Sequence, residues 1–497
     1  MIAFYLRKVR STLYLPIAAI LSLLTILSQS TTAQEFSRIE SSAGFNLKES
    51  TKGIAVADYD GDHDLDIFVV VQQTYDSLNV KTWNKLFRNN NDATFTDVTK
   101  AANLDKSISS LYTKRGASWG DYNNDGWPDL LLAYQSGVQL YQNLGDGKFK
   151  DVTQSANLNV SIGCEVKSSM WWDYNNDGLL DLFISGFSGC NENKVYKNLG
   201  NGTFENVTTS LGLNISNLSY MSIPIDVNHD GFTDVYSSVD FGENQLFVSN
   251  SGNSFTEKAA EYHLNSPGNN MGLATGDYNN DGIFDIYCTD IKANSLFKGN
   301  KNNIFSDLAA TYGIQNTDWA WQSRFADFDN DGDEDIYVVN GYGGVAYQNV
   351  LFKNLMVEKG GGFSDNSESS NLGISALNEC FETFDYDNDG DMDILISSEL
   401  GGESPAFFNN KTIDQIVTPG KRWLKVSLEG NKSNRNGFGA SLEIRYGGKK
   451  QFRLYHGVGL YSQSVQPIHF GVGTTSQIDT LLVNWPSGEI DTLIALP

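Results

Sequence analysis

The chain has 497 residues, of which 60 are acidic and 35 are basic, so its formal net charge is −25. Because phosphates need a basic surface, this charge argues against nucleic acid as a partner, and the 12% of aromatic residues excludes an acidic disordered tail. Four cysteines are too few for a disulfide-framed scaffold, and five histidines argue against a multi-histidine transition-metal centre.

Residues 1–33 predict a signal peptide, because a basic stretch precedes an apolar stretch and a small-residue cleavage site. The apolar stretch, Leu13 to Leu27, is shorter than the ~20 residues that span a bilayer. A single membrane anchor is the alternative interpretation. We therefore expect a mature chain without a membrane span that is secreted or displayed at the cell surface. There Cys164 and Cys190 are the expected disulfide pair, whereas Cys288 is expected to be a buried thiol in a strand.

A nine-residue acidic motif recurs seven times, and its clearest copy is Asp121-Tyr122-Asn123-Asn124-Asp125-Gly126-Trp127-Pro128-Asp129. Each copy belongs to a unit of four short β-rich runs bounded by turn residues. Four-stranded units of roughly 40–60 residues, repeated about four to eight times, are typical of a β-propeller. The pattern therefore predicts an all-β fold, with a seven-bladed β-propeller over residues 34–412.

The last unit lacks the fourth strand that the other units have. Residues 36–45 align with residues 149–158, which contain the fourth strand of the unit that begins with the Asp121 motif. We therefore expect the N-terminal strand to complete the last blade and close the ring, which removes the sheet edges that an open array would expose. An open solenoid of independent repeats is the alternative.

The spacing of oxygen-bearing side chains in the motif predicts calcium sites. Positions 1, 5 and 9 are Asp in all seven copies, position 3 is Asp or Asn, and position 6 is Gly in six copies and His63 in the first. Ca²⁺ takes about six to eight hard oxygen ligands. Glycine at position 6 allows a left-handed turn that brings the carbonyl of position 7 inward, and a non-glycine residue adopts such a turn at modest cost. An EF-hand is the rival interpretation, but no copy has the Glu at position 12 that it requires.

We expect up to seven Ca²⁺ ions, one for each blade, rather than Mg²⁺, which prefers a stricter octahedron. The predicted metal ligands are Asp58, Asp60, Asp62, Asp64, Asp66, Asp121, Asn123, Asp125, Trp127, Asp129, Asp173, Asn175, Asp177, Leu179, Asp181, Asp226, Asn228, Asp230, Phe232, Asp234, Asp277, Asn279, Asp281, Ile283, Asp285, Asp327, Asp329, Asp331, Asp333, Asp335, Asp385, Asp387, Asp389, Asp391 and Asp393.

The repeats resemble the FG-GAP/VCBS type of propeller blade, which occurs in integrin α subunits and in many secreted bacterial proteins. The resemblance covers about residues 36–410. It implies one bound Ca²⁺ per blade, in the hairpin between the first two strands, with a mainly structural role.

Residues 421–497 alternate apolar and polar side chains, which predicts a small all-β domain. Four motifs, at residues 436–440, 459–464, 469–473 and 485–488, together resemble the ASPIC/UnbV module. In the cartilage acidic protein family this module follows a repeat propeller of the same type. The resemblance suggests secretion and extracellular calcium binding and implies no secure enzymatic activity. We expect His456 and His469 to be structural.

A four-strand meander places the acidic loops on one face and the variable loops between second and third strands on the other, and recognition usually resides in such loops. We therefore predict a calcium-binding propeller that acts as a monomeric, non-catalytic recognition or adhesion module for an extracellular protein or glycan. The alternative is a carbohydrate-active enzyme, a lyase or hydrolase, that uses carboxylates in the central funnel. The best unassigned carboxylates for such an enzyme are Glu379, Glu382 and Glu165.

Overall fold

The computed structural model describes residues 36–72, 83–105, 114–135, 137–158, 165–187, 193–214, 218–399, 405–411 and 420–496. Over these residues the protein is almost entirely β-structure, as the sequence predicts. Its helices there are single turns, α1 (Ala259–Tyr262), α2 (Ala309–Tyr312) and α3 (Met356–Lys359), and none is long and apolar enough to cross a membrane. The predicted signal peptide and the expected Cys164–Cys190 pair lie outside the described residues.

The strands form four-stranded antiparallel units in chain order, each with one acidic loop between its first and second strands; strand pairing joins the fourth and fifth units into one eight-stranded sheet. The first three sheets contain β2 (Thr51–Ala57), β3 (Asp66–Val71), β4 (Lys85–Asn89) and β5 (Phe95–Asp97); β6 (Lys114–Gly120), β7 (Asp129–Tyr134), β8 (Gly137–Asn143) and β9 (Phe149–Asp151); and β10 (Val166–Trp172), β11 (Asp181–Gly186), β12 (Lys194–Asn198) and β13 (Phe204–Asn206). The next three contain β14 (Ser219–Ile225), β15 (Asp234–Glu243), β16 (Gln245–Ser249) and β17 (Phe255–Glu257); β18 (Pro267–Gly276), β19 (Asp285–Asp290), β20 (Ser295–Lys298) and β21 (Ser306–Asp307); and β22 (Ala320–Ala326), β23 (Asp335–Asn340), β25 (Val350–Asn354) and β26 (Phe363–Asp365).

The last acidic loop belongs to a sheet made of strands from the two ends of the repeat region. This sheet contains β28 (Phe381–Phe384), β29 (Asp393–Ile396) and β30 (Ala406–Asn410), and its fourth strand is β1 (Phe36–Arg38). Phe36 pairs with Asn410 and Arg38 pairs with Phe408. A two-stranded ladder of β24 (Tyr347–Gln348) and β27 (Ser375–Ala376) lies beside the repeats.

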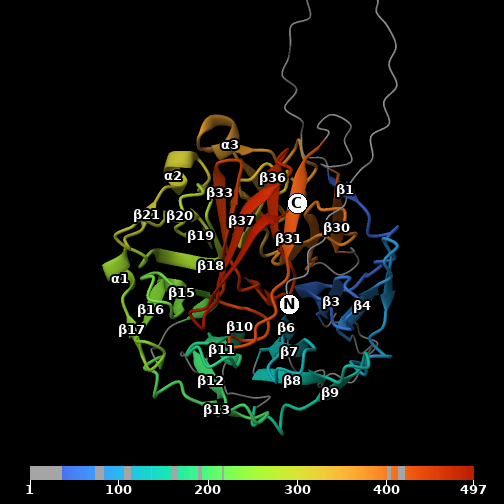
Figure 1. Cartoon of the computed structure of the whole chain (residues 1–497). Helices are drawn as coiled ribbons and strands as arrows, with labels where there is room; N and C mark the ends of the chain where they lie inside the picture. The colour runs from blue at the N-terminus through green and yellow to red at the C-terminus, as the bar shows by residue number, and fades with distance from the viewer. Residues whose placement is uncertain are drawn as a thin grey trace, which may run out of the picture.

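Figure 1 shows these sheets following one another around the molecule in chain order, from blue through green to orange. Neighbouring sheets are joined by aromatic packing. The tyrosine at position 2 of one loop contacts a phenylalanine of the next sheet's fourth strand, as in Tyr122 with Phe204, whose ring centroids are 5.7 Å apart. Tyr386 of the last loop makes the same contact with Phe95 of the first sheet, at 6.2 Å. Such edge and tilted pairs contribute beyond the area that they bury.

The C-terminal residues form a second all-β region. β31 (Arg422–Val426) pairs with β36 (Ile468–Gly473), and β32 (Ser441–Tyr446), β33 (Lys449–Leu454), β37 (Ile478–Asn484) and β38 (Ile490–Leu496) form a four-stranded sheet in the order β33-β32-β37-β38. In Figure 1 these red strands lie across the ring of repeat sheets rather than beside it.

One hairpin of this region enters the repeat region, which the sequence did not lead us to expect. We call it the central hairpin; it consists of β34 (Val458–Gly459) and β35 (Ser462–Gln463) with Leu460 and Tyr461 between them. β35 pairs in parallel with β6, Ser462 opposite Ala117, and also contacts β2 and β10, while β34 contacts β18 and β22. Because these are first strands of five different sheets, the hairpin packs at the centre of the repeats.

Candidate metal centre

The acidic loops share one backbone structure, which the carboxylate at position 1 holds in place. In the second loop Asp121 accepts hydrogen bonds from the backbone N–H groups of Asp125 and Gly126, at 3.0 and 2.8 Å. The equivalent bonds recur in the other loops at 2.8–3.2 Å. The glycine at position 6 has a positive φ throughout, and His63 has a φ of 72° in the first loop. The predicted left-handed turn at position 6 is therefore confirmed.

The carboxylate at position 9 is buried in every loop. Asp66, Asp129, Asp181, Asp234 and Asp285 are each fully buried, and Asp335 and Asp393 are nearly or fully so. One oxygen of each accepts a backbone N–H at the end of the same sheet's third strand, at 2.7–2.9 Å. This bond explains why the loop always ends in Asp at the first residue of the second strand.

Burial makes the charged form of these carboxylates costly and so raises their pKa. Desolvation raises the pKa of Asp66 to about 9 and that of Asp234 to about 8. It also raises the pKa of Asp173 and Asp277, at position 1, to about 7 each. Because an isolated buried carboxylate is costly in its charged form, a bound cation would return these groups to that form and stabilise the loops.

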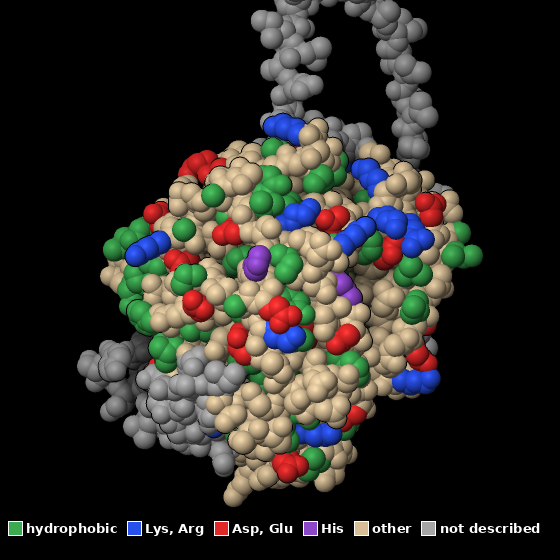
Figure 2. Space-filling model, turned by 90° about the vertical axis from the view of Figure 1, so that its left-hand side faces the viewer, with side chains coloured by type: hydrophobic (Ala, Val, Ile, Leu, Met, Phe, Trp, Pro, Cys, Tyr) green, Lys and Arg blue, Asp and Glu red, His purple; other side chains and the backbone are tan. Residues whose placement is uncertain are grey.

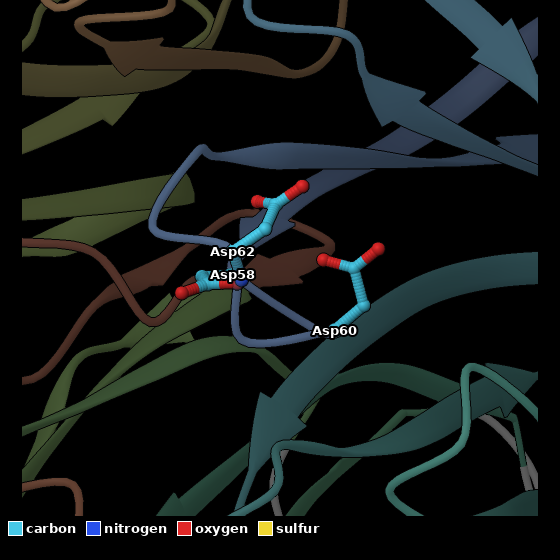
Figure 3. A group of neighbouring side chains, drawn as sticks. All are labelled: Asp58, Asp60 and Asp62. Carbon is cyan, nitrogen blue, oxygen red and sulfur yellow. The ribbon is translucent and has the colours of Figure 1, made fainter.

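The structure brings the predicted ligands together most closely in three loops. In the first loop, ligand atoms of Asp58, Asp60 and Asp62 lie within 4.8 Å of one another, and Figure 3 shows the three side chains on the single turn that joins β2 to β3. Asp327, Asp329 and Asp331 form the equivalent set in the sixth loop, and Asp385, Asp387 and Asp393 in the seventh. Among the described residues the other four loops hold no such set of three acids, because Asn stands at position 3 there.

In three of those four loops the Asn at position 3 turns toward the Asp at position 5, whereas Asn279 Nδ2 has no hydrogen-bond partner in the part of the chain that the structure describes. Asn123 donates through Nδ2 to Asp125 at 2.8 Å, and Asn175 and Asn228 do the same to Asp177 and Asp230. The position 7 residues were predicted to offer backbone carbonyls. The N–H groups of these residues fix the turn by donating to the carboxylate at position 5, at 2.9–3.1 Å for Trp127, Leu179, Phe232 and Ile283.

The sixth loop contains two groups that the sequence pattern did not identify. Glu358 of α3 lies within 4.8 Å of Asp331 and Asp333. Lys353 of β25 reaches into the same group, with its Nζ 2.6 Å from Asp329 and 2.6 Å from Glu358. Lys353 and Glu358 lie 18 and 23 positions beyond Asp335, the last residue of the loop, where no local spacing rule applies. This loop therefore already contains one cation of its own.

Orphaned oxygen atoms test whether the loops fit a metal ion. Five buried carboxylate oxygens of the loops have no hydrogen-bond partner: Asp60 Oδ1, Asp129 Oδ2, Asp181 Oδ2, Asp285 Oδ2 and Asp333 Oδ1. Buried polar atoms are nearly always paired, so each such atom calls for an explanation. A divalent cation that binds oxygen would explain these unpaired atoms. The loops offer carboxylate and amide oxygens, which are the hard ligands that such a cation prefers. The residues present therefore fit Ca²⁺.

Two sets of asparagines link neighbouring loops, and the sequence analysis missed both. The Asn at position 4 has a positive φ and donates to the next loop, as Asn124 does to the Gly178 carbonyl at 3.1 Å. The Asn at the end of the third strand donates to the previous loop, as Asn143 does to the Tyr59 carbonyl at 2.8 Å. The signal that would have found them is their recurrence at fixed positions outside the oxygen-ligand pattern.

The C-terminal region covers the face that carries the loops. Arg435 lies 3.6 Å from Asp121, and Asn436 accepts the Asp121 backbone N–H at 2.8 Å. Lys425 forms an ion pair with Asp385, and Lys421 lies 3.5 Å from Asp329. The C-terminal region thus places cations directly on ligands of the second, sixth and seventh loops.

The two histidines of this region are buried at the same contact. His456 is 2.7 Å from the Thr275 hydroxyl, and His469 is 3.1 Å from the Gly390 carbonyl. Burial lowers the pKa of each imidazole to about 3, helped by Arg324 for His456 and by Lys425 for His469. Both rings are therefore neutral and packed, in agreement with the structural role expected for them.

The carboxylates considered for catalysis are all paired. Glu382 is fully buried and accepts hydrogen bonds from Arg324 at 3.1 Å and from the hydroxyl of Ser464, beside the central hairpin, at 2.8 Å. Glu379 is ion-paired with Lys52, and Glu165 with Arg115 at 2.6 Å. All three carboxylates are thus held in contacts with neighbouring basic side chains.

Comparison with known families identifies both parts of the chain. FG-GAP-like repeats match residues 58–132, 121–165, 173–237, 226–288 and 277–338, which together make up more than half of the chain. The chain therefore belongs to the FG-GAP-like repeat family and is a β-propeller. The ASPIC and UnbV domain matches residues 430–497, so the C-terminal region is a member of that domain family. Both resemblances noted in the sequence are confirmed.

Comparison with curated proteins finds no match. Among solved structures, an Agrocybe aegerita lectin that recognises non-reducing terminal N-acetylglucosamine has 16% identity and a TM-score of 0.44, covering 66% of this chain and 83% of that chain. YCF48 bound to D1 peptide has 6% identity and a TM-score of 0.43, covering 76% and 95%. The Dos1 propeller has 8% identity and a TM-score of 0.40, covering 76% and 94%.

Proposed function

We propose that this protein is a calcium-stabilised, seven-bladed β-propeller that is secreted or displayed at the cell surface and acts as a non-catalytic recognition module. The observation that carries the proposal is the repeated acidic loop, which keeps one hydrogen-bonded geometry in seven copies, each with a buried carboxylate at position 9. The proposed division of the chain is a signal peptide at residues 1–33, the propeller at 34–412 and the ASPIC/UnbV domain at 421–497.

Hydrogen bonds between first and last sheets support a closed ring of seven blades. Asn89 of the first sheet donates to the Tyr386 carbonyl at 2.8 Å, the bond that Asn143 makes between the second sheet and the first. Asn388 of the last loop donates to Asp64 of the first at 3.0 Å. Together with the β1–β30 pairing, these bonds repeat between last and first units the contacts made between neighbours along the chain.

The excess negative charge is concentrated in the acidic loops and is not spread evenly over the surface. The loops hold 24 Asp at positions 1, 3, 5 and 9, out of 60 acidic residues. On the side of the molecule shown in Figure 2, acidic and basic side chains are scattered among uncharged ones. The acidity is therefore best explained as a set of metal sites.

A structural rather than catalytic role follows from the positions of the remaining carboxylates. Glu165, Glu379 and Glu382 are held in ion pairs, and the central hairpin packs against the first strands of five sheets. Recognition is then left to the face remote from the acidic loops, where strand connections differ in length from unit to unit.

Calcium removal tests the proposal. Extracellular sites bind Ca²⁺ with dissociation constants of roughly 10⁻⁴–10⁻³ M, so each site contributes about 0.4–1.4 kcal/mol at millimolar calcium. Seven sites predict a melting temperature that falls steeply in EDTA and returns on adding Ca²⁺, with about seven ions per chain by elemental analysis. The variant Asp129→Asn should lose one ion, whereas Asp146→Asn, in an exposed turn outside the loops, should lose none. A melting curve unchanged by EDTA would refute the metal assignment.

A further inference from the structure

An array of aromatic rings lies at the strand ends remote from the acidic loops. We call it the far-face array; its members are Phe187, Tyr220, Trp319, Trp321 and Tyr342. Phe187 follows β11 and Tyr342 follows β23, both strands that begin at a loop, while the other three stand at or just before the start of a strand that leads into one. The array therefore belongs to the face opposite the proposed calcium sites.

The rings form a continuous series across different sheets. The rings of Trp319 and Tyr342 are stacked, with centroids 3.8 Å apart and planes at 11°. Trp321 lies 6.1 Å from Tyr342 and 5.8 Å from Tyr220, and Tyr220 lies 5.5 Å from Phe187. The series thus joins the third, fourth and sixth sheets.

The outer end of the array is exposed and held rigidly. Tyr342 is 47% exposed although one face of its ring is covered by Trp319. The turn that carries it is closed by reciprocal backbone bonds between Tyr342 and Val345, at 3.2 and 2.9 Å. Gly341 donates to the Trp319 carbonyl at 3.1 Å and accepts the Trp321 indole N–H at 2.5 Å. The turn that carries Tyr342 is therefore hydrogen-bonded to the segment that carries Trp319 and Trp321, and such preorganisation lowers the entropy cost of binding.

The inner end of the array is bordered by ion-paired side chains. Lys167 lies over Phe187 and Tyr220, 4.2 and 4.8 Å from their ring centroids. The same ammonium group pairs with Glu165 at 2.8 Å, and Glu165 pairs with Arg115 at 2.6 Å. These side chains offer several hydrogen-bond donors and acceptors next to the apolar rings.

We propose that the far-face array is a saccharide-binding site with Tyr342 as its stacking platform, which rests on the proposed recognition function. A pyranose ring has one face of C–H groups, which packs against the negative face of an aromatic ring, and hydroxyl groups at its edge, which suit carboxylates, amides and guanidinium groups. A protein partner fits less well. Stable protein interfaces bury about 800 Å² on each side around an apolar core, whereas Tyr342 and Val345 are the exposed large apolar side chains of this turn.

The test uses the full chain in calcium against immobilised neutral and acidic mono- and oligosaccharides, followed by titration calorimetry with the strongest binder. We expect Tyr342→Ala to weaken binding at least tenfold and Tyr342→Phe to stay within threefold of wild type. Phe241→Ala is the matched control, because Phe241 is 76% exposed at the same end of its strand, on β15, and belongs to none of the ring pairs. It should bind as wild type does.

Three outcomes would overturn the saccharide site. The wild-type chain binds no saccharide; Tyr342→Ala binds as tightly as wild type; or Phe241→Ala weakens binding as much as Tyr342→Ala does. If a protein ligand is lost in Tyr342→Ala while no saccharide binds, the far face is a protein interface and the saccharide assignment is wrong. Because the EDTA melting experiment is independent of these arms, the calcium proposal can hold while this one fails.

Discussion

Gln463 offers the sharpest test of how the ASPIC/UnbV domain is attached to the propeller. Its side chain is fully buried and makes three hydrogen bonds. The Trp171 N–H donates to its carbonyl oxygen at 2.6 Å, and its Nε2 donates to the carbonyls of Trp171 and His456 at 3.0 and 2.9 Å. The substitution Gln463→Ala removes all three bonds and leaves three buried backbone groups without partners.

The expected cost follows from those groups. A buried donor or acceptor left unsatisfied costs about 1–3 kcal/mol, and water entering beside the shortened side chain can satisfy part of the loss. We therefore expect Gln463→Ala to lower the free energy of unfolding by about 3–5 kcal/mol. Urea unfolding at fixed calcium, followed by the tryptophan fluorescence of the chain, measures it. Gln154→Ala, at an exposed turn position, is the control and should change little.

A loss below about 1 kcal/mol for Gln463→Ala would refute this reasoning, since surface substitutions commonly change stability by up to about 0.5 kcal/mol. Such a small loss would mean that water replaces the three hydrogen bonds of the Gln463 side chain at little cost in free energy. A loss in the expected range, with the calcium content unchanged, would show that the hairpin stabilises the propeller through its polar contacts rather than through the metal sites.

Three more changes have predictable results. His63→Gly should raise the melting temperature in calcium, because glycine adopts the φ of 72° without strain and the replaced side chain is 75% exposed; a lower melting temperature would contradict this. Asn143→Ala should destabilise by about 2–4 kcal/mol in urea unfolding, because it removes the donor that the carbonyls of Tyr59 and Pro128 share, and an effect as small as that of an exposed Asn would count against the linkage. Burial holds the pKa of His456 and His469 at about 3 in the folded protein, below the ordinary 6.5. The unfolded chain therefore takes up protons first, so stability at saturating calcium should fall as pH drops from 6.5 toward 3, by up to about 1.4 kcal/mol per pH unit for each ring. His456→Gln should reduce that slope, and an unchanged slope would show that this ring is not responsible.

The sequence pattern of the repeat was enough to predict the strands and the loop geometry. Each unit carries its own strand pattern, turn residues and acidic spacing, so all seven copies report the same local structure. The positive φ at position 6 followed from Gly126 and its equivalents, and His63 adopts the same conformation. Repeated local patterns predict local structure well, because a copy that departs from the pattern can be interpreted from the copies that keep it.

Contacts between units were not predictable in the same way. Asn124 and Asn143 look like ordinary turn and strand-end residues, and nothing in their own unit says which neighbour they bond. The family motif at residues 459–464 did not predict where the central hairpin packs. Gly53 and Gly116, in the first strands of two sheets, do indicate its position. A Cβ at either position would lie 2.4–2.6 Å from the Tyr461 carbonyl oxygen. Glycine inside a strand often marks such a close approach of another backbone.

The pairing of β1 with β30 has a consequence for the order of events during synthesis. Arg38 and Phe408 are partners in this ladder, so the ribosome must add about 370 residues between them. At about 5–20 residues per second, β1 waits roughly 20–75 seconds for its partner strand. During that time its backbone edge is open to pairing with other chains. Among the described strands, the first to leave the ribosome is thus among the last to pair, and nascent chains need protection at β1 until residue 410 has emerged.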